Sequence, residues 1–189
     1  MSVTIYYRQW NNEISSHALL DIAVTDYLNE IKGEDMGTTD SAYIMKKLPA
    51  EASLTSYALI EKGGHGKLYL RDYADVYFSV SHSGGYWMCA VGDSELGLDI
   101  QADEPVKAEK LSRRFFHPEE VRFMEINGFE YFCQIWACKE SYLKLTGAGL
   151  SEGMGHFSVI NSFTRLPGLD DPKQYIIDWK EGYSVVLSK

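Results

Sequence analysis

The amino-acid sequence predicts an α+β fold made of two similar halves. Its 189 residues suffice for one ordinary domain or for two small halves that share a core, and hydrophobic residues make up 45% of them. Helical patterns and at least three strand-like segments occur in each half. This mixture is typical of α+β proteins, and we expect the halves to cover residues 1–101 and 102–189.

The N-terminal half is expected to begin with a strand and a long helix. Leu20, Val24, Tyr27 and Ile31 follow one another at spacings of three and four, which predicts a helix over residues 16–31. A weaker helical pattern follows near residues 40–47. The stretch EKGGHGKLYL predicts a glycine-rich turn that enters a short strand. The other strands predicted in this half cover residues 3–7, 76–81, 86–91 and 95–101.

The C-terminal half is expected to begin with three helices and to end with strands. The first helix covers residues 107–115, the second starts at Pro118, and the third runs from residue 129 to residue 146. Gly147 follows the third helix directly, at a position where glycine commonly caps a helix end. Strand-like patterns return over residues 156–160, 174–179 and 183–188.

The composition argues against several classes of function. A net charge of −9 does not suit a nucleic-acid-binding protein, which needs Lys and Arg side chains to neutralise phosphates. The chain begins without the apolar core of a signal peptide and contains no apolar stretch long enough to span a membrane. Its three cysteines form no CxxC pattern, which suits a reducing compartment. We expect a cytoplasmic monomer that binds neither nucleic acid nor membrane.

The stretch SELGLDIQAD, residues 94–103, combines a strand pattern with a polar face. Aliphatic residues alternate with Gly97, Asp99 and Gln101, so the two polar side chains lie on the same side of the strand. The glycine beside them allows another group to approach the strand closely. Together with Glu140, they would make an oxygen-lined site for Mg²⁺, which takes few protein ligands and completes its coordination with water and phosphate oxygens.

The helix FEYFCQIWACKESYLKLTG carries polar residues beside its apolar stripe. The stripe consists of Phe132, Ile135, Cys138, Tyr142 and Leu145. Glu140 and Lys144 lie four residues apart and therefore on one face of the helix. Two interpretations stay open: a solvent-exposed ion pair worth about 0.3–0.5 kcal/mol, or a functional pair.

Two glycine-rich places in the N-terminal half are candidates for binding an anion. Ser81 and His82 end a predicted strand just before two glycines, where side chains and backbone N–H groups are exposed together. The alternative is a histidine that only makes local hydrogen bonds. The stretch GGHGK is not a P-loop, because Glu61 and Leu68 stand where that motif needs a glycine and a Ser or Thr. If Lys67 in this stretch does not bind an anion, it is a solvated lysine in a hairpin turn.

Three ordered stretches are GKLYLRDYADVYFSVSHSGGYWMCAVGDSELGLDIQ, RRFFHPEE and WACKESYLKLTGAGL. Over about residues 66–151 they resemble the 4′-phosphopantetheinyl transferases of the two-domain, single-chain, surfactin-synthetase-activating type. The resemblance implies two pseudo-symmetric halves, each a small antiparallel sheet with helices, and an active site in the cleft between them. It also implies a Mg²⁺-dependent reaction. The phosphopantetheine arm of coenzyme A moves to a serine of an acyl or peptidyl carrier protein, and 3′,5′-ADP is released.

The resemblance also implies roles for single residues. The expected catalytic residues are Asp99, Glu140 and Lys144. The expected metal ligands are Asp99, Gln101 and Glu140, with Mn²⁺ as a substitute for Mg²⁺. The residues expected to contact coenzyme A are Lys67, Ser81, His82, Asp99, Lys139 and Lys144. Glu120 matches a further acidic position near the metal or its water.

Gln101 departs from the family pattern, because the commoner residue at this position is Glu. The departure slightly favours an alternative function, a degenerate relative that binds coenzyme A or a carrier protein without transfer. The basic cluster that holds the 3′-phosphate in the best-known members has no match by motif, and its candidates are Arg8, Lys46, Lys47 and Lys62. A basic face on the helix at 107–115 is either a docking site for an acidic carrier protein or an ordinary solvated face. This face consists of Lys107, Lys110, Arg113 and Arg114.

Overall fold

The structure is a computed structural model that describes residues 3–11, 13–33, 41–48, 60–62, 68–149 and 153–189. Contacts between Cα atoms divide the chain into two compact units, Met1–Leu96 and Gly97–Lys189. Each unit combines helices with a small sheet, so the predicted α+β class is confirmed.

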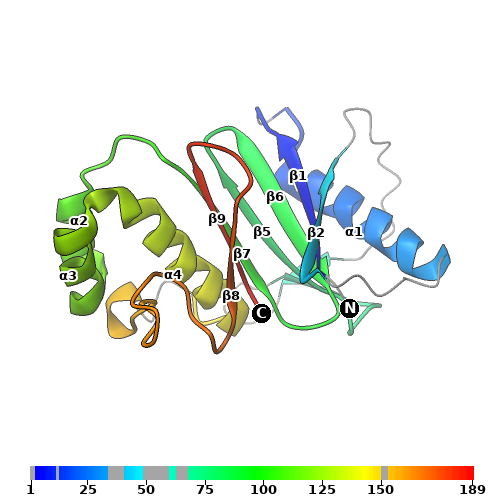
Figure 1. Cartoon of the computed structure of the whole chain (residues 1–189). Helices are drawn as coiled ribbons and strands as arrows, with labels where there is room; N and C mark the ends of the chain where they lie inside the picture. Colours follow the sequence, from blue (N-terminus) through cyan, green and yellow to red (C-terminus); the bar gives the residue numbers. More distant parts are fainter. Residues whose placement is uncertain (1–2, 12, 34–40, 49–59, 63–67, 150–152) are drawn as a thin grey trace. The chain divides into compact units, whose positions relative to one another are not determined.

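The first unit is built on a four-stranded sheet (Figure 1). Its strands are β1 (Val3–Gln9), β2 (Tyr43–Lys47), β5 (Tyr77–Ser83) and β6 (Tyr86–Gly92), in the order β2-β1-β6-β5. β1 and β2 are parallel, whereas the other neighbours are antiparallel. Helix α1 (Ser16–Gly33) contacts β6, and β3 (Ile60–Lys62) forms a separate antiparallel pair with β4 (Leu68–Leu70).

The core of the first unit confirms the apolar stripe predicted for α1. Leu20, Val24 and Tyr27 are at most 2% exposed and belong to the same buried cluster as Trp87. Trp87 Nε1 donates a hydrogen bond of 2.8 Å to Ser16 Oγ, which holds the first turn of the helix on the sheet.

The helical segment predicted near residues 40–47 is wrong, because Tyr43–Lys47 is the strand β2. Its residues pair one by one with β1, from Val3 opposite Tyr43 to Tyr7 opposite Lys47. Pairing with a strand that is distant in the sequence here outweighs a weak local helical pattern.

The second unit packs a central helix against a three-stranded sheet. The sheet contains β7 (Gly97–Ala102), β8 (Gln174–Ile177) and β9 (Tyr183–Ser188) in the antiparallel order β7-β9-β8. Helix α4 (Phe132–Thr146) lies between this sheet and the helices α2 (Ala108–Phe115) and α3 (Pro118–Asn127) (Figure 1). The short 3₁₀ turns η2 (Phe129–Tyr131) and η4 (Met154–His156) precede and follow α4 in the chain.

Two details of the second unit differ from expectation. β7 was expected to close the N-terminal half, but its partner is β9, so it begins the second unit. The strand predicted at 156–160 is wrong: the turn η4 ends at His156, the next three residues are irregular, and Ile160 forms only an isolated bridge with Pro167. The physical reason is that the Val159 N–H donates to the Glu120 carboxylate instead of to a neighbouring strand.

Close backbone contact fixes α4 on β7, and Gly97 makes this contact possible. A Cβ atom at residue 97 would lie 1.9 Å from the carbonyl oxygen of Ser141 and 2.5 Å from the backbone nitrogen of Leu145. The close approach predicted for this glycine is therefore confirmed, and the approaching group is α4. The helix ends as predicted at Gly147, which has a left-handed φ of 70°.

A buried polar cluster ties α4 to the other strands of its sheet. Ser141 Oγ and Ser188 Oγ lie 2.8 Å apart, and Gln174 Nε2 donates to the Cys138 carbonyl over 2.7 Å. Because these groups are buried and hydrogen-bonded to one another, they fix the position of the helix against the sheet without an unpaired polar atom among those bonds.

The three cysteines are free thiols. Cys89 and Cys138 are completely buried, and Cys133 is half-buried. The helical pattern predicts Cys133 and Cys138 as small core residues, which is confirmed for Cys138, whereas Cys133 lies at the edge of the core.

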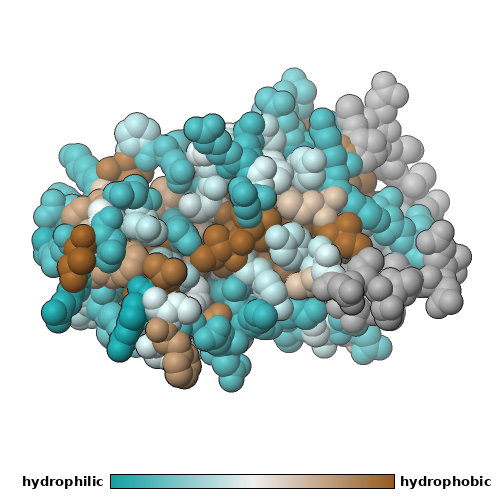
Figure 2. Space-filling view, in the orientation of Figure 1, coloured by the Kyte–Doolittle hydropathy of each residue, from teal (hydrophilic) through white to brown (hydrophobic). Residues whose placement is uncertain are grey.

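Hydrophilic side chains predominate on the face of the molecule shown in Figure 2, and hydrophobic ones occur there in separate small groups. Within the described part of the chain, we find no helix that combines the length and the apolar character needed to cross a membrane.

Candidate functional site

Asp99 and Lys144 meet where α4 lies on β7. Asp99 is 2% exposed, and its Oδ1 atom accepts a hydrogen bond of 2.7 Å from Lys144 Nζ. The same ammonium donates to the carbonyl oxygen of Leu98 over 3.0 Å. This cross-link joins the last turn of the helix to the strand, and it depends on the close approach at Gly97.

Gln101 lies beside Asp99, as the alternation of the strand predicts. Its Nε2 atom donates to Asp99 Oδ2 over 2.8 Å. Both carboxylate oxygens of Asp99 therefore accept a hydrogen bond from a neighbouring side chain.

Glu140 completes a group of four polar side chains in the second unit. It is half-buried, and burial raises the pKa of its carboxyl group. The negative charge of Asp99 raises this pKa further, while the positive charge of Lys144 lowers it. The solvent-exposed ion pair considered for this helix does not describe the structure, because Lys144 binds the buried Asp99 instead.

Three of the four residues offer oxygen ligands of the kind that Mg²⁺ prefers. Asp99 and Glu140 supply two carboxylates that repel each other, and Gln101 can supply an amide oxygen. No three His, Cys, Asp or Glu side chains of the described residues gather into a group that could hold a metal ion. Two carboxylates and one amide oxygen are a donor set that an ion with few protein ligands accepts.

Glu120 and Lys139 do not join this group in the structure but bind each other. Lys139 Nζ lies 2.7 Å from Glu120 Oε1, and both side chains are 0% exposed. In this arrangement neither side chain is accessible to coenzyme A or to a metal ion. Glu120 also closes a capping box with His117 at the start of α3, but nothing local in the sequence indicates its pairing with Lys139.

The candidate coenzyme contacts of the first unit lie on and near β5. Ser81 is 7% exposed, whereas His82 is exposed and its ring centroid lies 4.7 Å from that of Trp10. Lys67 lies outside the described residues. Among the candidates for holding the 3′-phosphate, Lys46 forms an ion pair with Glu30. The coenzyme contacts of Ser81, His82 and Lys67 stay predictions.

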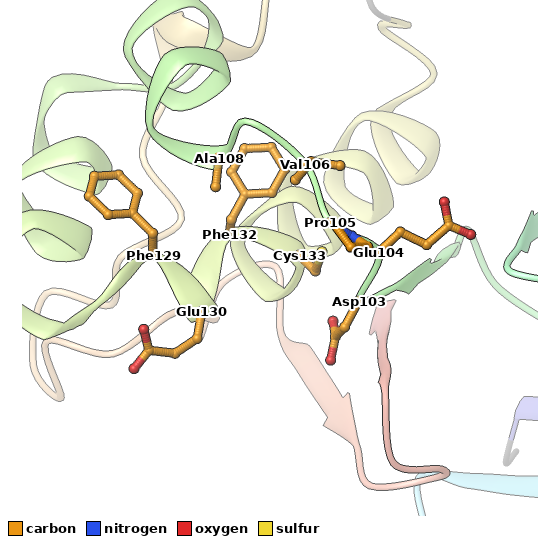
Figure 3. A pocket seen from close by; sticks show the side chains of 9 residues that line it. All are labelled: Asp103, Glu104, Pro105, Val106, Ala108, Phe129, Glu130, Phe132 and Cys133. Atoms are coloured by element: carbon orange, nitrogen blue, oxygen red, sulfur yellow. The ribbon is translucent and has the colours of Figure 1, made fainter.

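The second unit also contains a pocket of about 290 Å³ just beyond the end of β7. Figure 3 shows Phe132 and Cys133 of α4 on one side and Pro105 on the other, with the Glu104 carboxylate pointing away from Phe132. The remaining lining residues are Asp103, Val106, Ala108, Phe129 and Glu130. Three of the nine lining residues are acidic, and negative charge of this kind does not favour binding of a phosphate group.

The second unit and the end of the first match a known family. Residues 95–187 match the model of the 4′-phosphopantetheinyl transferase superfamily. This part of the chain belongs to that superfamily. The match contains all four residues of the Asp99 group and the Glu120–Lys139 pair, so the predicted family is confirmed.

Individual relatives support the same assignment. The chain is 35% identical over 99 residues to a 4′-phosphopantetheinyl transferase of Bacillus subtilis. This match covers 50% of this chain and 44% of that protein. It is 34% identical over 104 residues to the transferase psf-1 of Bacillus pumilus, covering 53% and 44%. It is 30% identical over 109 residues to the transferase gsp of Aneurinibacillus migulanus, covering 56% and 42%. Each match spans less than half of the relative's own length.

Proposed function

We propose that the chain is a 4′-phosphopantetheinyl transferase that moves the phosphopantetheine arm of coenzyme A to a serine of an acyl or peptidyl carrier protein. The observation that carries the proposal is the convergence of Asp99, Glu140 and Lys144 from β7 and α4, inside the region that matches the superfamily. Location in the cytoplasm and a monomeric state remain predictions from the composition.

Asp99, Glu140 and Gln101 are the residues that would hold Mg²⁺. When bound there, the ion would neutralise charge on the pyrophosphate and make the attacked phosphorus more electrophilic. Gln101 brings no charge, so two carboxylates provide the negative charge at this place. We therefore expect Mg²⁺ binding to depend strongly on bound coenzyme A.

In the proposed reaction the serine oxygen forms a bond to the phosphorus that carries the pantetheine arm. The bond from this phosphorus to the bridging oxygen breaks, and the electron pair leaves with 3′,5′-ADP. Glu140 takes the serine proton directly or through a water molecule, for which burial and the charge of Asp99 make it a stronger base. Lys144 stabilises or protonates the departing phosphate oxygen.

We further propose that helix α2 helps to dock an acidic carrier protein. Of its basic side chains, Arg113 is occupied by Glu109 at 3.1 Å and by Glu125 at 2.7 Å. Lys107, Lys110 and Arg114 are exposed and carry the positive charge of this face. The attraction acts over short distances, because the whole chain has a net charge of −9.

A non-catalytic relative that only binds coenzyme A or a carrier protein is the second candidate. It is favoured by Gln101, whose amide donates to Asp99 where a further carboxylate is commoner in the family. The two candidates predict different results when the protein is incubated with coenzyme A, Mg²⁺ and an acidic carrier domain.

Mass spectrometry of the carrier domain decides between them. A mass increase by one phosphopantetheine group that is lost in Asp99→Ala supports the transferase. Binding of coenzyme A in calorimetry without any mass increase supports the non-catalytic relative. Absence of both binding and transfer overturns both.

A further inference from the structure

The buried ion pair of Glu120 and Lys139 has no role in the proposed reaction. Lys139 has three N–H donors, of which two donate to oxygen atoms of the protein, and its side chain is 0% exposed. One donates to Glu120 Oε1 at 2.7 Å and another to the Phe157 carbonyl oxygen at 2.6 Å. The ammonium also lies 4.1 Å from the centre of the Phe157 ring, a cation–π contact. This ammonium therefore has no free side on which it could hold a phosphate group.

The Glu120 carboxylate connects three segments of the second unit. Besides Lys139 of α4, its Oε1 atom accepts the Val159 N–H at 2.8 Å. Its Oε2 atom accepts the His117 N–H at 2.9 Å, which closes the capping box of α3. The start of α3, the middle of α4 and the loop after η4 thus meet at one carboxylate.

A pair of this kind contributes more to geometry than to stability. Removing two charges from water costs several kcal/mol per ion, so a buried pair is often no more stabilising than apolar side chains of the same size. Its hydrogen bonds, however, are satisfied in only one arrangement of the helices. A rotation of α4 would separate Lys139 from Glu120 and leave a buried charge without a partner.

The rotation of α4 determines where the Asp99 group meets. Lys139 and Glu140 are consecutive, so their side chains leave the helix about 100° apart, and Lys144 lies about 40° from Glu140. Anchoring Lys139 on one side therefore fixes the direction in which Glu140 and Lys144 point.

We propose that Glu120 and Lys139 are positioning residues that set the rotation of α4, so that Glu140 and Lys144 face Asp99. Neither residue contacts coenzyme A or a metal ion. The inference rests on the proposed function of the Asp99 group and adds two residues through which that group is held.

The test compares single and double variants of the full chain. Glu120→Gln and Lys139→Met each leave an uncompensated buried group, and both should be destabilised. The double variant Glu120→Gln with Lys139→Met removes both charges, keeps an amide oxygen that can accept the Val159 N–H, and should be less destabilised than either single variant. The matched control is Glu119→Gln with Arg165→Met, which removes an exposed pair of 3.7 Å between α3 and the same loop.

The folded double variant should still lose the site. We expect Mn²⁺, measured alone by electron paramagnetic resonance, to bind at least about fivefold more weakly, and kcat to fall about tenfold with the KM for coenzyme A within about twofold. The control should match the wild type in all three. Unchanged Mn²⁺ affinity and kcat would show that the pair is merely structural. A KM for coenzyme A raised more than about tenfold at normal kcat would make Lys139 a ligand contact. If the wild type binds Mn²⁺ but transfers nothing, the proposed function fails, and the Mn²⁺ comparison still decides on the positioning role.

A second measurement needs no variant. Lysine acylation followed by mass spectrometry should leave Lys139 unmodified in the folded protein, with or without coenzyme A, because its side chain is 0% exposed. Lys144, whose side chain is 28% exposed, should react and should be protected by coenzyme A. Reaction of Lys139 in the folded protein, or its protection by coenzyme A, would overturn the proposal.

Discussion

Replacing Gly97 by alanine tests how the strand and the helix build the candidate site. The added Cβ would lie 1.9 Å from the Ser141 carbonyl oxygen and 2.5 Å from the Leu145 nitrogen, and both are backbone atoms that cannot rotate away. Non-bonded contact begins near 3.5 Å, so β7 and α4 would have to separate by about 1.5 Å. A shift of that size breaks the bond of 2.7 Å between Lys144 and Asp99.

The magnitude follows from two opposing effects. Overpacking of a core costs about 1–3 kcal/mol, and contact with backbone places this variant at the upper end. Replacing glycine also restricts the unfolded chain, which by itself stabilises by about 0.4–1 kcal/mol. The net loss is about 2–3 kcal/mol, equivalent to a fall of about 4–12 °C in Tm for a chain of this length.

Thermal unfolding followed by circular dichroism measures the effect on stability, and a transfer assay measures the effect on the site. Gly155→Ala is the matched control, because its added Cβ would lie 3.5 Å from the nearest atom, the Phe115 carbonyl oxygen. We expect Gly97→Ala to lose both stability and transfer, and the control to keep both. A Tm and a transfer rate of Gly97→Ala equal to those of the control would refute the close contact between β7 and α4.

Three further predictions concern the charges of the second unit. Because the pKa of Glu140 is raised in the folded protein, its protonated carboxyl group favours folding. This contribution to the free energy of unfolding is fully present below the ordinary carboxyl pKa of 4.5 and is lost as the pH rises through the raised pKa. Glu140→Gln should therefore unfold at a higher temperature than the wild type at pH 7 but not at pH 4, while transfer falls at least about 100-fold; equal midpoints at pH 7 would contradict the cost of burying this charge beside Asp99. Gln101→Glu should lower, and Gln101→Ala should raise, the Mg²⁺ concentration for half-maximal transfer, and three superimposable titration curves would remove this residue from the metal. Lys110→Glu with Arg114→Glu should raise the KM for the carrier protein about tenfold but leave that for coenzyme A unchanged, and Arg113→Glu should have a smaller effect; equal changes for both substrates would argue against docking on α2.

A strong periodicity of apolar residues correctly predicted the strand and the helix that build the candidate site. Where the periodicity was weak, the predicted secondary structure was wrong. The alternation around Asp99 and the spacing of Glu140 and Lys144 are local properties of β7 and α4, so they could be derived from the sequence. Residues 40–47 were misassigned because their partner strand is distant in the sequence. Strand pairing of this kind cannot be derived from a local pattern.

The partners of the site residues were beyond reach for a related reason. Lys144 faces Glu140 in the helical pattern, yet it binds Asp99, which lies 45 positions away in the chain. Lys139 stands among the charged residues of a helix and is nevertheless completely buried, because Glu120 neutralises its charge and the Phe157 carbonyl oxygen accepts a hydrogen bond from it. A charged residue becomes a core residue only through such distant partners.

The burial of the three thiols has a chemical consequence for a protein whose proposed substrate itself ends in a thiol. Burial raises the pKa of Cys89 and Cys138 far above its ordinary value, and burial together with the nearby Asp103 raises that of Cys133 to about 11. At pH 7.5 the reactive thiolate of Cys133 is then about one part in several thousand. Disulfide exchange with coenzyme A or with a pantetheine arm needs that thiolate. The three cysteines should therefore react only slowly with coenzyme A disulfide, and the protein should stay mostly unmodified in its presence.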